Sequence, residues 1–446
     1  MRADAADPSG RRERSGRPSR PVAAVSALVT AACVPLAGAT TAQARPPAPE
    51  PARAVVPAAG RDRHPVVSWA ASADRQGAGP AERSYRLVVR TSVGGTDLRV
   101  RLSNAFGEHP VTFASAYAGL QQRGAALVPG SNRPLTFGGQ PSVTVPTGQT
   151  VVSDALPGRL AAQSNLVISL HVTGAEGPTT GHGMAMQTSY AAAGDHAAEE
   201  AATNWTDPIG SWYWLDSVSV ETPTTISAVA FLGDSITDGW ASTSDANRRW
   251  PDYLSRRLQA ASGNTVRGVA NEGISGNQVL ADGAGQAALH RLERDVLSQP
   301  GVGTVFLLEG INDIKAHTGV TVDDLVAGYR QIVDRAHAAG RCVVGATVMP
   351  YKGWYEYDAA GEAVRQGVND WIRHGGAFDA VVDFDAVTRS PYDPQALLPF
   401  FDGGDHLHPN DKGMQAMADA VDLAVLRCDR LAGARSTAGS GGSATG

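Results

Sequence analysis

A buried strand gives way to a polar turn in the stretch Phe231-Leu232-Gly233-Asp234-Ser235-Ile236-Thr237-Asp238-Gly239. The strand is predicted by the β-branched and apolar run Thr224–Leu232. At Gly233 this run stops, and an acid, a serine and a polar turn follow. Because open α/β sheets bind ligands at the carboxyl ends of their parallel strands, Ser235 is placed where a reactive group would lie.

Ser235 taken alone has two interpretations. Its hydroxyl is a nucleophile if a base lies beside it, and its backbone N–H can help to hold an oxyanion. The alternative is an ordinary strand-to-helix turn in which the serine or Asp234 caps the helix. Residues further along the chain favour the first interpretation.

Strand-like and helical segments alternate from residue 223 to residue 431. The expected strands are Ile226–Leu232, Thr265–Ala270, Thr304–Leu308, Cys342–Val348 and Ala380–Phe384, and the expected helices are Trp250–Ala261, Ala287–Leu297, Thr321–Gly340, Ala359–His374 and Asn410–Leu426. Alternation with short connections predicts a parallel sheet with helices on both faces, which is a three-layer α/β/α domain.

Polar segments come after four of these strands, on one rim of the predicted sheet. Ser235 follows the first strand, Asn271–Gly276 the second and Glu309–Asp313 the third, while Asp405–Pro409 lies in the long loop after the fifth. Any one of these segments, taken alone, could be an ordinary turn, since Gly, Asn and Asp favour turns for backbone reasons. Together they supply a nucleophile, hydrogen-bond donors, a base and an acid.

These segments resemble the sequence blocks of the SGNH hydrolases, also called the GDSL esterase/lipase family. Gly233-Asp234-Ser235 matches the nucleophile block, Gly273 the second, Gly310-Ile311-Asn312-Asp313 the third and Asp405-x-x-His408-Pro409 the last. The resemblance covers most of residues 223–431. The nucleophile block differs from the Gly-x-Ser-x-Gly elbow of α/β-hydrolases because the second glycine is missing.

The resemblance implies a role for each matching residue. Ser235 would attack an ester carbonyl, and His408 would take its proton and return it to the leaving alcohol. Asp405 would orient His408 and stabilise its cation. The oxyanion would be held by the backbone N–H groups of Ser235 and Gly273 and by the side-chain amide of Asn312.

Other polar residues in these blocks receive secondary interpretations. His406 is the alternative base because it is adjacent to Asp405, but the family spacing and the following proline favour His408. Asp234 and Asp313 are expected to hold the turns around Ser235 and Asn312. The remaining histidines have no metal-ligand spacing, and no phosphate loop or dinucleotide motif is present, so no metal and no cofactor are expected.

Residues 64–222 carry short apolar runs with period-2 alternation and no helical pattern, which predicts an antiparallel β-sandwich. A hairpin is expected from Tyr85–Thr91 and Asp97–Ser103 across Val93-Gly94-Gly95. Further strands are expected at Val111–Ala118, Leu135–Phe137, Ser142–Val145, Thr150–Ser153 and Asn165–Val172. The aromatic cluster Trp205, Trp212, Tyr213 and Trp214 is assigned to core or interface packing rather than to sugar stacking. This half resembles the β-rich domain that precedes the catalytic domain in some secreted actinobacterial members of the family.

The two ends of the chain are predicted to lie outside both domains. Residues 1–44 have an arginine-rich start, an apolar stretch at Val22–Ala39 and the cleavage site Ala42-Gln43-Ala44, as in a signal peptide for export by the Sec or the Tat route. Residues 45–63 form a Pro/Ala-rich linker. Residues 432–446 form a small, polar tail that we expect to be disordered.

Two cysteines, Cys342 and Cys428, remain after removal of the signal peptide. One opens a predicted strand and the other closes the last predicted helix, so both lie on the rim opposite the polar segments. A disulfide is possible there in an oxidising compartment, and two buried free thiols are the alternative.

The expected protein is a secreted serine esterase that cleaves carboxylic esters through an acyl-enzyme. Short-chain or acetyl esters, in particular O-acetyl groups of carbohydrates, are favoured as substrates. A lipase or phospholipase acting on lipid esters is one alternative, and a catalytically inactive carbohydrate-binding protein is another. The net charge of −6 and the pI near 6.0 indicate neither a nucleic-acid partner nor a membrane patch. We expect a monomer without a stable membrane anchor that acts on a small-molecule or polysaccharide ester.

Overall fold

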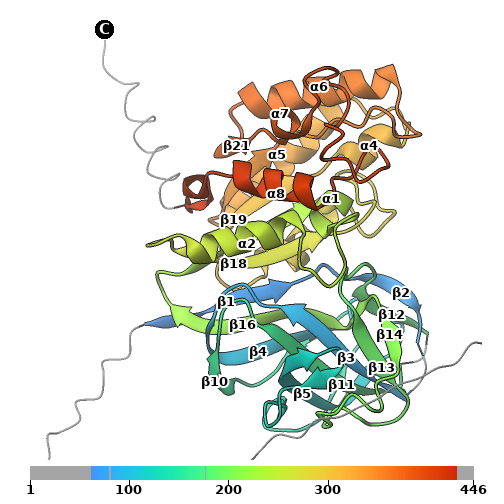
Figure 1. Cartoon of the computed structure of the whole chain (residues 1–446), viewed down its shortest axis with the longest axis vertical. Helices are drawn as coiled ribbons and strands as arrows, with labels where there is room; N and C mark the ends of the chain where they lie inside the picture. Colours follow the sequence, from blue (N-terminus) through green and yellow to red (C-terminus); the bar gives the residue numbers. More distant parts are fainter. Residues whose placement is uncertain (1–61, 80–81, 176, 429–446) are drawn as a thin grey trace, which may run out of the picture. The chain divides into compact units, whose positions relative to one another are not determined.

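The computed structural model describes residues 62–79, 82–175 and 177–428. In these residues a β region, which ends with strand β16 at Pro223, is followed by an α/β region that starts with strand β17 at Ser227 (Figure 1). The predicted signal peptide (1–44), nearly all of the linker (45–63) and the tail (432–446) lie outside the described residues. The exact domain boundaries stay predictions.

Five parallel strands form the sheet of the α/β region in the order β18-β17-β19-β20-β21. Their bounds are Ser227–Gly233 for β17, Val266–Gly273 for β18, Val302–Leu308 for β19, Cys342–Ala346 for β20 and Ala380–Val382 for β21. Gly233 is opposite Gly273 on one side and Leu308 on the other. The three strands that precede the first three polar segments therefore end at the same level of the sheet.

Helices cover both faces of this sheet, which confirms the predicted three-layer α/β/α class. Their bounds are α1 Ser235–Asp238, α2 Trp250–Ala260, α3 Ala288–Arg291, π-helix η1 Leu292–Leu297, α4 Ile311–Lys315, α5 Val322–Ala338, α6 Ala359–His374, α7 Phe384–Thr388, α8 Asp411–Ala420 and 3₁₀-helix η2 Leu423–Leu426. Alternate residues of β17 separate the two layers. Phe231 packs in a cluster with α2 and α8, whereas Leu232 belongs to a cluster with α5 and α6.

Several predicted elements have other bounds in the structure; for example, the strand expected at Cys342–Val348 ends at Ala346, and that expected at Thr265–Ala270 extends to Gly273. The strand expected at Ala380–Phe384 stops at Val382, because Asp383 caps α7 by accepting from the backbone N–H of Ala386. The helix expected at Ala287–Leu297 divides into α3 and η1. The helix expected at Asn410–Leu426 ends at Ala420, where the backbone becomes extended before η2 begins.

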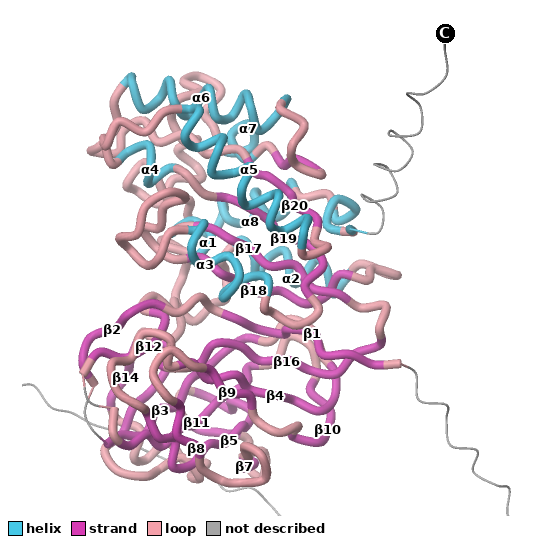
Figure 2. The backbone as a smooth tube through the Cα atoms, turned by 180° about the vertical axis from the view of Figure 1, so that it is seen from behind, coloured by secondary structure: helices cyan, strands magenta, loops and turns pink. Residues whose placement is uncertain are grey.

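Antiparallel strands make up the β region, which confirms its predicted class (Figure 2, magenta). The strands are β1 Arg63–Ala70, β2 Asp74–Ala78, β3 Glu82–Arg90, β4 Gly95–Ser103, β5 Val111–Arg123, β6 Ala126–Leu127, β7 Arg133–Pro134, β8 Val143–Val145, β9 Thr150–Val152, β10 Leu156–Leu160, β11 Asn165–Thr173, β12 Pro178–His182, β13 Ser189–Ala192, β14 Asp207–Ile209, β15 Trp212–Tyr213 and β16 Leu215–Pro223. One sheet has the order β1-β16-β4-β10, with β9 also on β4. A second has the order β14-β13-β3-β11-β5-β6, with β7 and β8 also on β5, and β15-β12-β2 form a third.

The hairpin predicted from Tyr85–Thr91 and Asp97–Ser103 is wrong. The corresponding strands, β3 and β4, lie in different sheets. The residues between them bond to other segments: Thr91 donates its N–H to the carbonyl of Ser164, and Ser92 donates its N–H to that of Ser68. The connection therefore crosses from one sheet to the other. The strand expected at Leu135–Phe137 is also wrong, since the nearby strand β7 covers only Arg133–Pro134.

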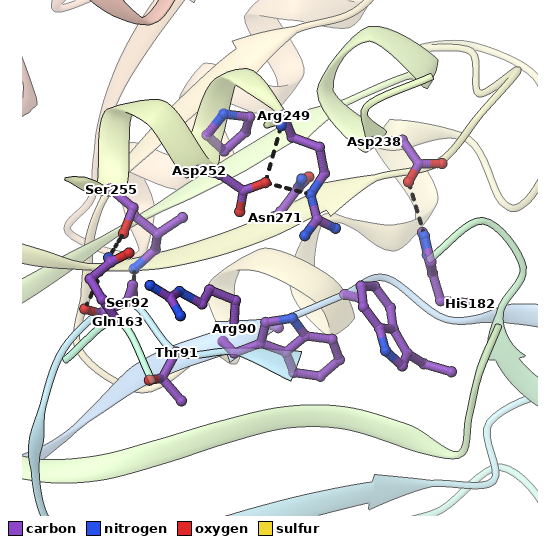
Figure 3. Close-up of a pocket in the computed structure, with 16 residues that line it drawn as sticks. Arg90, Thr91, Ser92, Gln163, His182, Asp238, Arg249, Asp252, Ser255 and Asn271 are labelled. Atoms are coloured by element: carbon purple, nitrogen blue, oxygen red, sulfur yellow. Dashed lines mark hydrogen bonds and ion pairs between the residues drawn. The ribbon is translucent and has the colours of Figure 1, made fainter. Parts of the chain in front are cut away.

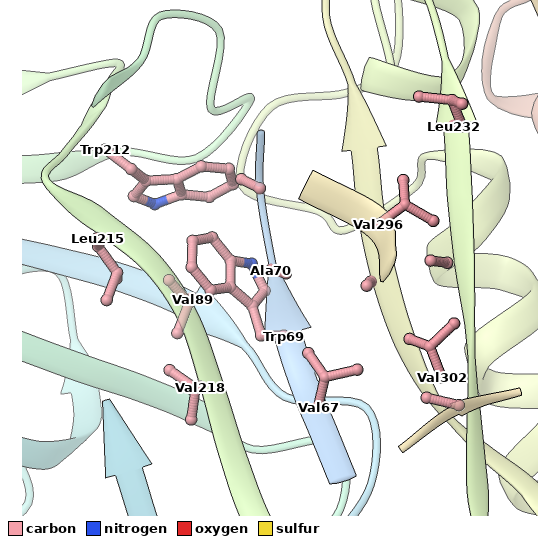
Figure 4. Packing of buried hydrophobic residues seen from close by; sticks show 14 of the residues in the cluster. Val67, Trp69, Ala70, Val89, Trp212, Leu215, Val218, Leu232, Val296 and Val302 are labelled. Atoms are coloured by element: carbon pink, nitrogen blue, oxygen red, sulfur yellow. The ribbon is translucent and has the colours of Figure 1, made fainter. Parts of the chain in front are cut away.

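The tryptophans predicted to pack in the interior are buried. Trp212 meets Trp69 edge to face, with 4.8 Å between the ring centroids (Figure 4). Trp205 lies in a separate buried cluster, where the guanidinium of Arg86 is 4.1 Å from its ring centroid. Packing rather than sugar stacking accounts for these side chains.

Strand β1 packs against the α/β region. It pairs with β16, and its Val67 belongs to the same buried cluster as Val296 and Val302 of the α/β region (Figure 4). Just beyond β1, Ala71 forms a parallel bridge with Asn271 of β18. One continuous apolar core therefore spans both regions.

A disulfide joins Cys342 at the start of β20 to Cys428, with the Cα atoms 5.4 Å apart. Of the two alternatives left open by the sequence, the structure therefore has the disulfide.

No helix in residues 62–79, 82–175 and 177–428 has both the length and the apolar character that crossing a membrane requires.

Candidate active site

The turn after β17 places Ser235 at the start of a short helix. Asp234 is the N-cap of α1, and its side chain accepts from the backbone N–H of Ile236 at 2.9 Å. Ser235 is the first residue of α1, so its own N–H has no acceptor within the helix. Helix α1 is followed by its C-cap Gly239, whose φ of 106° is a left-handed conformation suited to glycine.

Ser235, His408 and Asp405 form a chain of hydrogen bonds. The Ser235 Oγ lies 2.8 Å from His408 Nε2, and His408 Nδ1 lies 2.7 Å from Asp405 Oδ2. The other carboxylate oxygen, Asp405 Oδ1, accepts the backbone N–H groups of Leu407 and His408 at 3.0 and 2.8 Å. Because the carboxylate accepts from Nδ1, the tautomer with a free lone pair on Nε2 is favoured, and Nε2 can then accept the serine proton.

Burial and hydrogen bonding together set the protonation states of His408 and Asp405. Burial lowers the pKa of His408 below the ordinary value, and the opposing effect of the Asp405 carboxylate does not cancel this. Burial would raise the pKa of Asp405, but hydrogen bonds from the backbone and ring of His408 outweigh it and leave that pKa below its usual value. At neutral pH the histidine is therefore a neutral acceptor and the aspartate an ionised one.

His406, the alternative base, has a different partner. Its Nδ1 lies 2.6 Å from Asp402 Oδ2, and more than half of its side chain is exposed. The backbone of His406 has a left-handed conformation, with a φ of 66°. In the structure Asp405 is thus paired with His408 and not with its sequence neighbour.

The predicted oxyanion donors Ser235, Gly273 and Asn312 lie at or just after the carboxyl ends of three adjacent strands. The N–H of Gly273 already donates to Asn271 Oδ1 at 3.1 Å. The amide of Asn312 donates one hydrogen to the carbonyl of Asn277 at 2.8 Å and keeps a second. The Ser235 N–H and one amide hydrogen of Asn312 can therefore donate directly to an oxyanion. The N–H of Gly273 can do so only after it leaves Asn271 Oδ1.

Gly273 packs directly against α1. A Cβ atom at this position would lie 2.3 Å from the backbone nitrogen of Asp238. No side chain fits there without displacing the helix that starts with Ser235.

Three buried carboxyl groups, those of Asp234, Glu309 and Asp313, belong to the same sequence segments as Ser235 and Asn312. Burial raises the pKa of Asp234 to about 7 and that of Asp313 to about 6, and it raises the pKa of Glu309 well above its ordinary value. Asp313 accepts the backbone N–H groups of Val279 and Leu280 at 2.9 and 3.0 Å. Asp234 caps α1, in agreement with its predicted role at the turn around Ser235. Asp313 also has a structural role, but its side chain holds the backbone of Val279 and Leu280, whereas the prediction placed it at the turn around Asn312.

Sequence reasoning did not identify Arg291, which is fully buried. Its guanidinium donates to the carbonyls of Gly233 (3.0 Å) and Glu272 (2.6 Å), and its Nε donates to Asn277 Oδ1 (2.9 Å). It thereby links the ends of β17 and β18 to the residue that holds Asn312. A single arginine within a helical pattern gives no sequence signal for such a role.

Aromatic side chains flank His408. The rings of Trp240 and Trp354 both lie 5.8 Å from the imidazole, measured between centroids. Trp240 is 48% exposed, and Tyr355, whose ring contacts Trp354, is 79% exposed. Accessible aromatic surface therefore lies near His408, and no sequence motif indicated it.

An α/β/α sheet with a serine, a histidine and a carboxylate in contact at its carboxyl rim is the arrangement of a serine hydrolase. Residues 231–416 match the model of the GDSL-like Lipase/Acylhydrolase family, in agreement with the predicted resemblance. The chain thus carries a carboxylic ester hydrolase domain, as predicted. A comparison with curated proteins finds no match.

Several solved structures are similar to nearly half of this chain. They include a lipolytic protein of the G-D-S-L family from Desulfitobacterium hafniense (19% identity, 45% of this chain and 99% of that chain, TM-score 0.36). An acylhydrolase from Bacteroides fragilis matches at 22% identity over 45% of this chain and 88% of its own, with a TM-score of 0.35. Axe2, an acetylxylan esterase from Geobacillus stearothermophilus, matches at 24% identity over 46% of this chain and 96% of its own, with a TM-score of 0.35.

Proposed function

We propose that the protein is a serine esterase in which Ser235 is the nucleophile, His408 the general base and acid, and Asp405 the residue that orients the histidine. The observation that carries this proposal is the unbroken chain of contacts from Ser235 Oγ through His408 to Asp405 Oδ2. A neutral His408 can take the hydroxyl proton as the oxygen attacks the ester carbonyl. The imidazolium then returns this proton to the leaving alcohol, and water later releases the acyl group by the same steps.

Charge that develops on the carbonyl oxygen would be held by the backbone N–H of Ser235 and the free amide hydrogen of Asn312. Gly273 would join them once its N–H turns from Asn271 Oδ1 to the oxyanion. A donor aimed at the oxyanion contributes about 2.7–4 kcal/mol to lowering the barrier. Asn312 is fixed for this task by its bond to Asn277, which in turn is held by Arg291.

We propose acetyl or other short-chain esters of carbohydrates as the substrates. Exposed aromatic surface from Trp240 and Tyr355 close to His408 supports this choice, because sugar rings stack on such faces. Lipid esters are the alternative, and the experiment below separates the two.

We further propose that the protein is secreted. The signal-peptide pattern of residues 1–44 is one support. The Cys342–Cys428 disulfide is another, since such bonds persist in oxidising compartments.

Hydrolysis of p-nitrophenyl esters from acetate to palmitate, with Ser235→Ala beside the wild type, tests the proposal. Turnover limited to acetate and butyrate, and lost in the variant, is the expected result. Activity on acetylated xylo-oligosaccharides would then place the substrate among carbohydrates. A maximum at long acyl chains would contradict the carbohydrate proposal, and turnover that survives Ser235→Ala would contradict the nucleophile. A wild-type chain that neither hydrolyses any ester nor reacts with a fluorophosphonate would be the inactive binding protein instead.

A further inference from the structure

The β region contacts the helix that begins with Ser235 through one buried histidine. His182 is the last residue of β12, and its Nε2 lies 2.9 Å from Oδ1 of Asp238 (Figure 3). Asp238 is the last residue of α1, one turn after Ser235. The side chains of His182 and Asp238 are both almost fully buried.

The surroundings of His182 favour its charged form. Its Nδ1 lies 2.9 Å from the carbonyl of Ser72, and its Nε2 also lies 3.0 Å from the carbonyl of Met184. Carbonyls and a carboxylate only accept hydrogen bonds, so both ring nitrogens are satisfied only when both carry a proton. Burial alone would lower the pKa of His182, but Asp238 and these carbonyls raise it above the ordinary value.

The carboxylate of Asp238 also holds the segment after Gly273. Its Oδ2 accepts the backbone N–H of Ser275 at 2.9 Å and the hydroxyl of Ser275 at 2.8 Å. One carboxylate therefore joins the β region, the helix of the nucleophile and the loop that follows the oxyanion glycine. Buried charge-assisted hydrogen bonds of this kind fix geometry more firmly than neutral ones.

A second set of contacts starts from Ser72, the residue whose carbonyl accepts from His182. The Ser72 hydroxyl donates to Glu272 Oε2 at 2.9 Å and accepts from Arg291 at 2.8 Å. Arg291 is the side chain that also donates to the carbonyl of Gly233. The β region thus contacts α1 directly and, through Arg291, the end of β17, the strand that precedes α1.

We propose that His182 is a positioning residue for ester hydrolysis: the β region supplies a buried cation that fixes Asp238 and, through it, the placement of Ser235 and of the loop carrying Gly273. The β region is then a part of the active-site scaffold and not an independent appendage. This inference rests on the proposed function of Ser235.

Two substitutions of His182 test the hydrogen bonds of its two ring nitrogens one at a time. His182→Gln places an amide N–H close to the position of Nε2 and keeps a donor toward Asp238. His182→Asn places its N–H close to the position of Nδ1, which keeps the donor toward Ser72 and loses the one toward Asp238. Gln163→Asn is the matched control, because Gln163 joins the β region to α2 through Ser255 Oγ at 2.7 Å without touching α1 (Figure 3).

The test measures kcat, KM and Tm on p-nitrophenyl acetate, at a temperature well below the Tm of every variant. For His182→Asn we expect kcat to fall about 10- to 100-fold, the scale of a small misplacement of a reacting group, with KM nearly unchanged. The rate of fluorophosphonate attachment to Ser235 should fall in parallel, and His182→Gln should restore most of both rates. Gln163→Asn should keep the wild-type kcat whatever its effect on Tm.

A folded His182→Asn variant with the wild-type kcat would overturn the inference, as would equal losses in His182→Gln and His182→Asn. If His182→Asn does not fold, Ser275→Ala replaces it, because it loosens the same carboxylate from the other side. An unchanged kcat in that variant would also overturn the inference. Failure of the proposed function is distinguishable, since the wild type itself would then show no turnover that depends on Ser235.

Discussion

Asp405→Asn is the substitution that most sharply probes how the histidine is oriented. One carboxylate oxygen, Oδ1, accepts the backbone N–H groups of Leu407 and His408, so an asparagine must place its carbonyl oxygen there. Its NH₂ group then faces His408 Nδ1, where the carboxylate oxygen had been. Two donors cannot face each other, so Nδ1 loses its proton and Nε2 gains one. The nitrogen beside Ser235 Oγ would then be a donor and unable to accept the serine proton.

The expected cost follows from this change of tautomer. The same exchange in the serine-protease triad lowers kcat by about 10⁴, and we expect a loss of about 10³- to 10⁴-fold here. That range corresponds to about 4–5.5 kcal/mol of transition-state stabilisation. The fold should be little affected, because both backbone bonds to the side chain are kept.

The assay is p-nitrophenyl acetate hydrolysis, with a thermal melt of each variant. Asp402→Asn is the matched control: Asp402 accepts the backbone N–H groups of Gly404 and His406 and pairs with the ring of His406. It makes the same kind of contacts with a histidine that does not face Ser235, so its kcat should stay at the wild-type level. A folded Asp405→Asn variant that keeps more than a tenth of the wild-type kcat would refute the reasoning.

Four further predictions concern other parts of the molecule. Replacing both Cys342 and Cys428 by serine should lower the free energy of unfolding by up to about 4–5 kcal/mol in urea titrations, because the bond closes a long loop; equal stability would contradict this. The kcat/KM for p-nitrophenyl acetate should fall on acidification with an apparent pKa below about 6.5, because neutral His408 is the active form and burial lowers its pKa; a midpoint above that value would argue against it. Gly273→Ala should abolish turnover, since the added methyl meets the backbone of α1, and an active, equally stable variant would disprove the close contact. Trp240→Ala should raise KM for acetylated xylo-oligosaccharides while leaving KM for p-nitrophenyl acetate unchanged; equal effects on both substrates would remove the case for sugar stacking there.

The α/β region could be predicted well because its local signals agree with one another. The strand before Ser235 is a continuous apolar run, and helix α6 has the predicted bounds, Ala359–His374. The errors fall at element ends, where capping decides. Asp383 begins a new helix at a point that the apolar pattern assigned to strand Ala380–Phe384.

The β region was harder to predict because strand partners are distant in the sequence. In strand β4 the apolar residues Leu98, Val100 and Leu102 alternate with arginines and are buried, as period-2 alternation in a strand implies. This alternation could not indicate that β3 and β4 belong to different sheets, since a short Gly-containing connection serves a hairpin and a crossover equally well. Pairing is decided by contacts such as that of Thr91 with Ser164, which the local sequence does not encode.

The residues of the candidate site also fall into two groups, those that the sequence predicts and those that it does not. Ser235, Asp405 and His408 could be assigned from short motifs, and the structure brings their side chains into contact. Arg291 and His182 could not be assigned, because each acts through carbonyls and carboxylates contributed by segments far along the chain. Buried connecting residues of this kind leave no local pattern.

The measurement that tests the central claim most directly is the mass of the peptide containing Ser235 after reaction with a fluorophosphonate, taken together with the remaining ester hydrolysis. We expect one adduct per chain, located on Ser235, with activity lost in proportion to labelling and no adduct in the Ser235→Ala or His408→Ala variants. Active protein with an unlabelled Ser235, or labelling of another residue that removes the activity, would contradict the account.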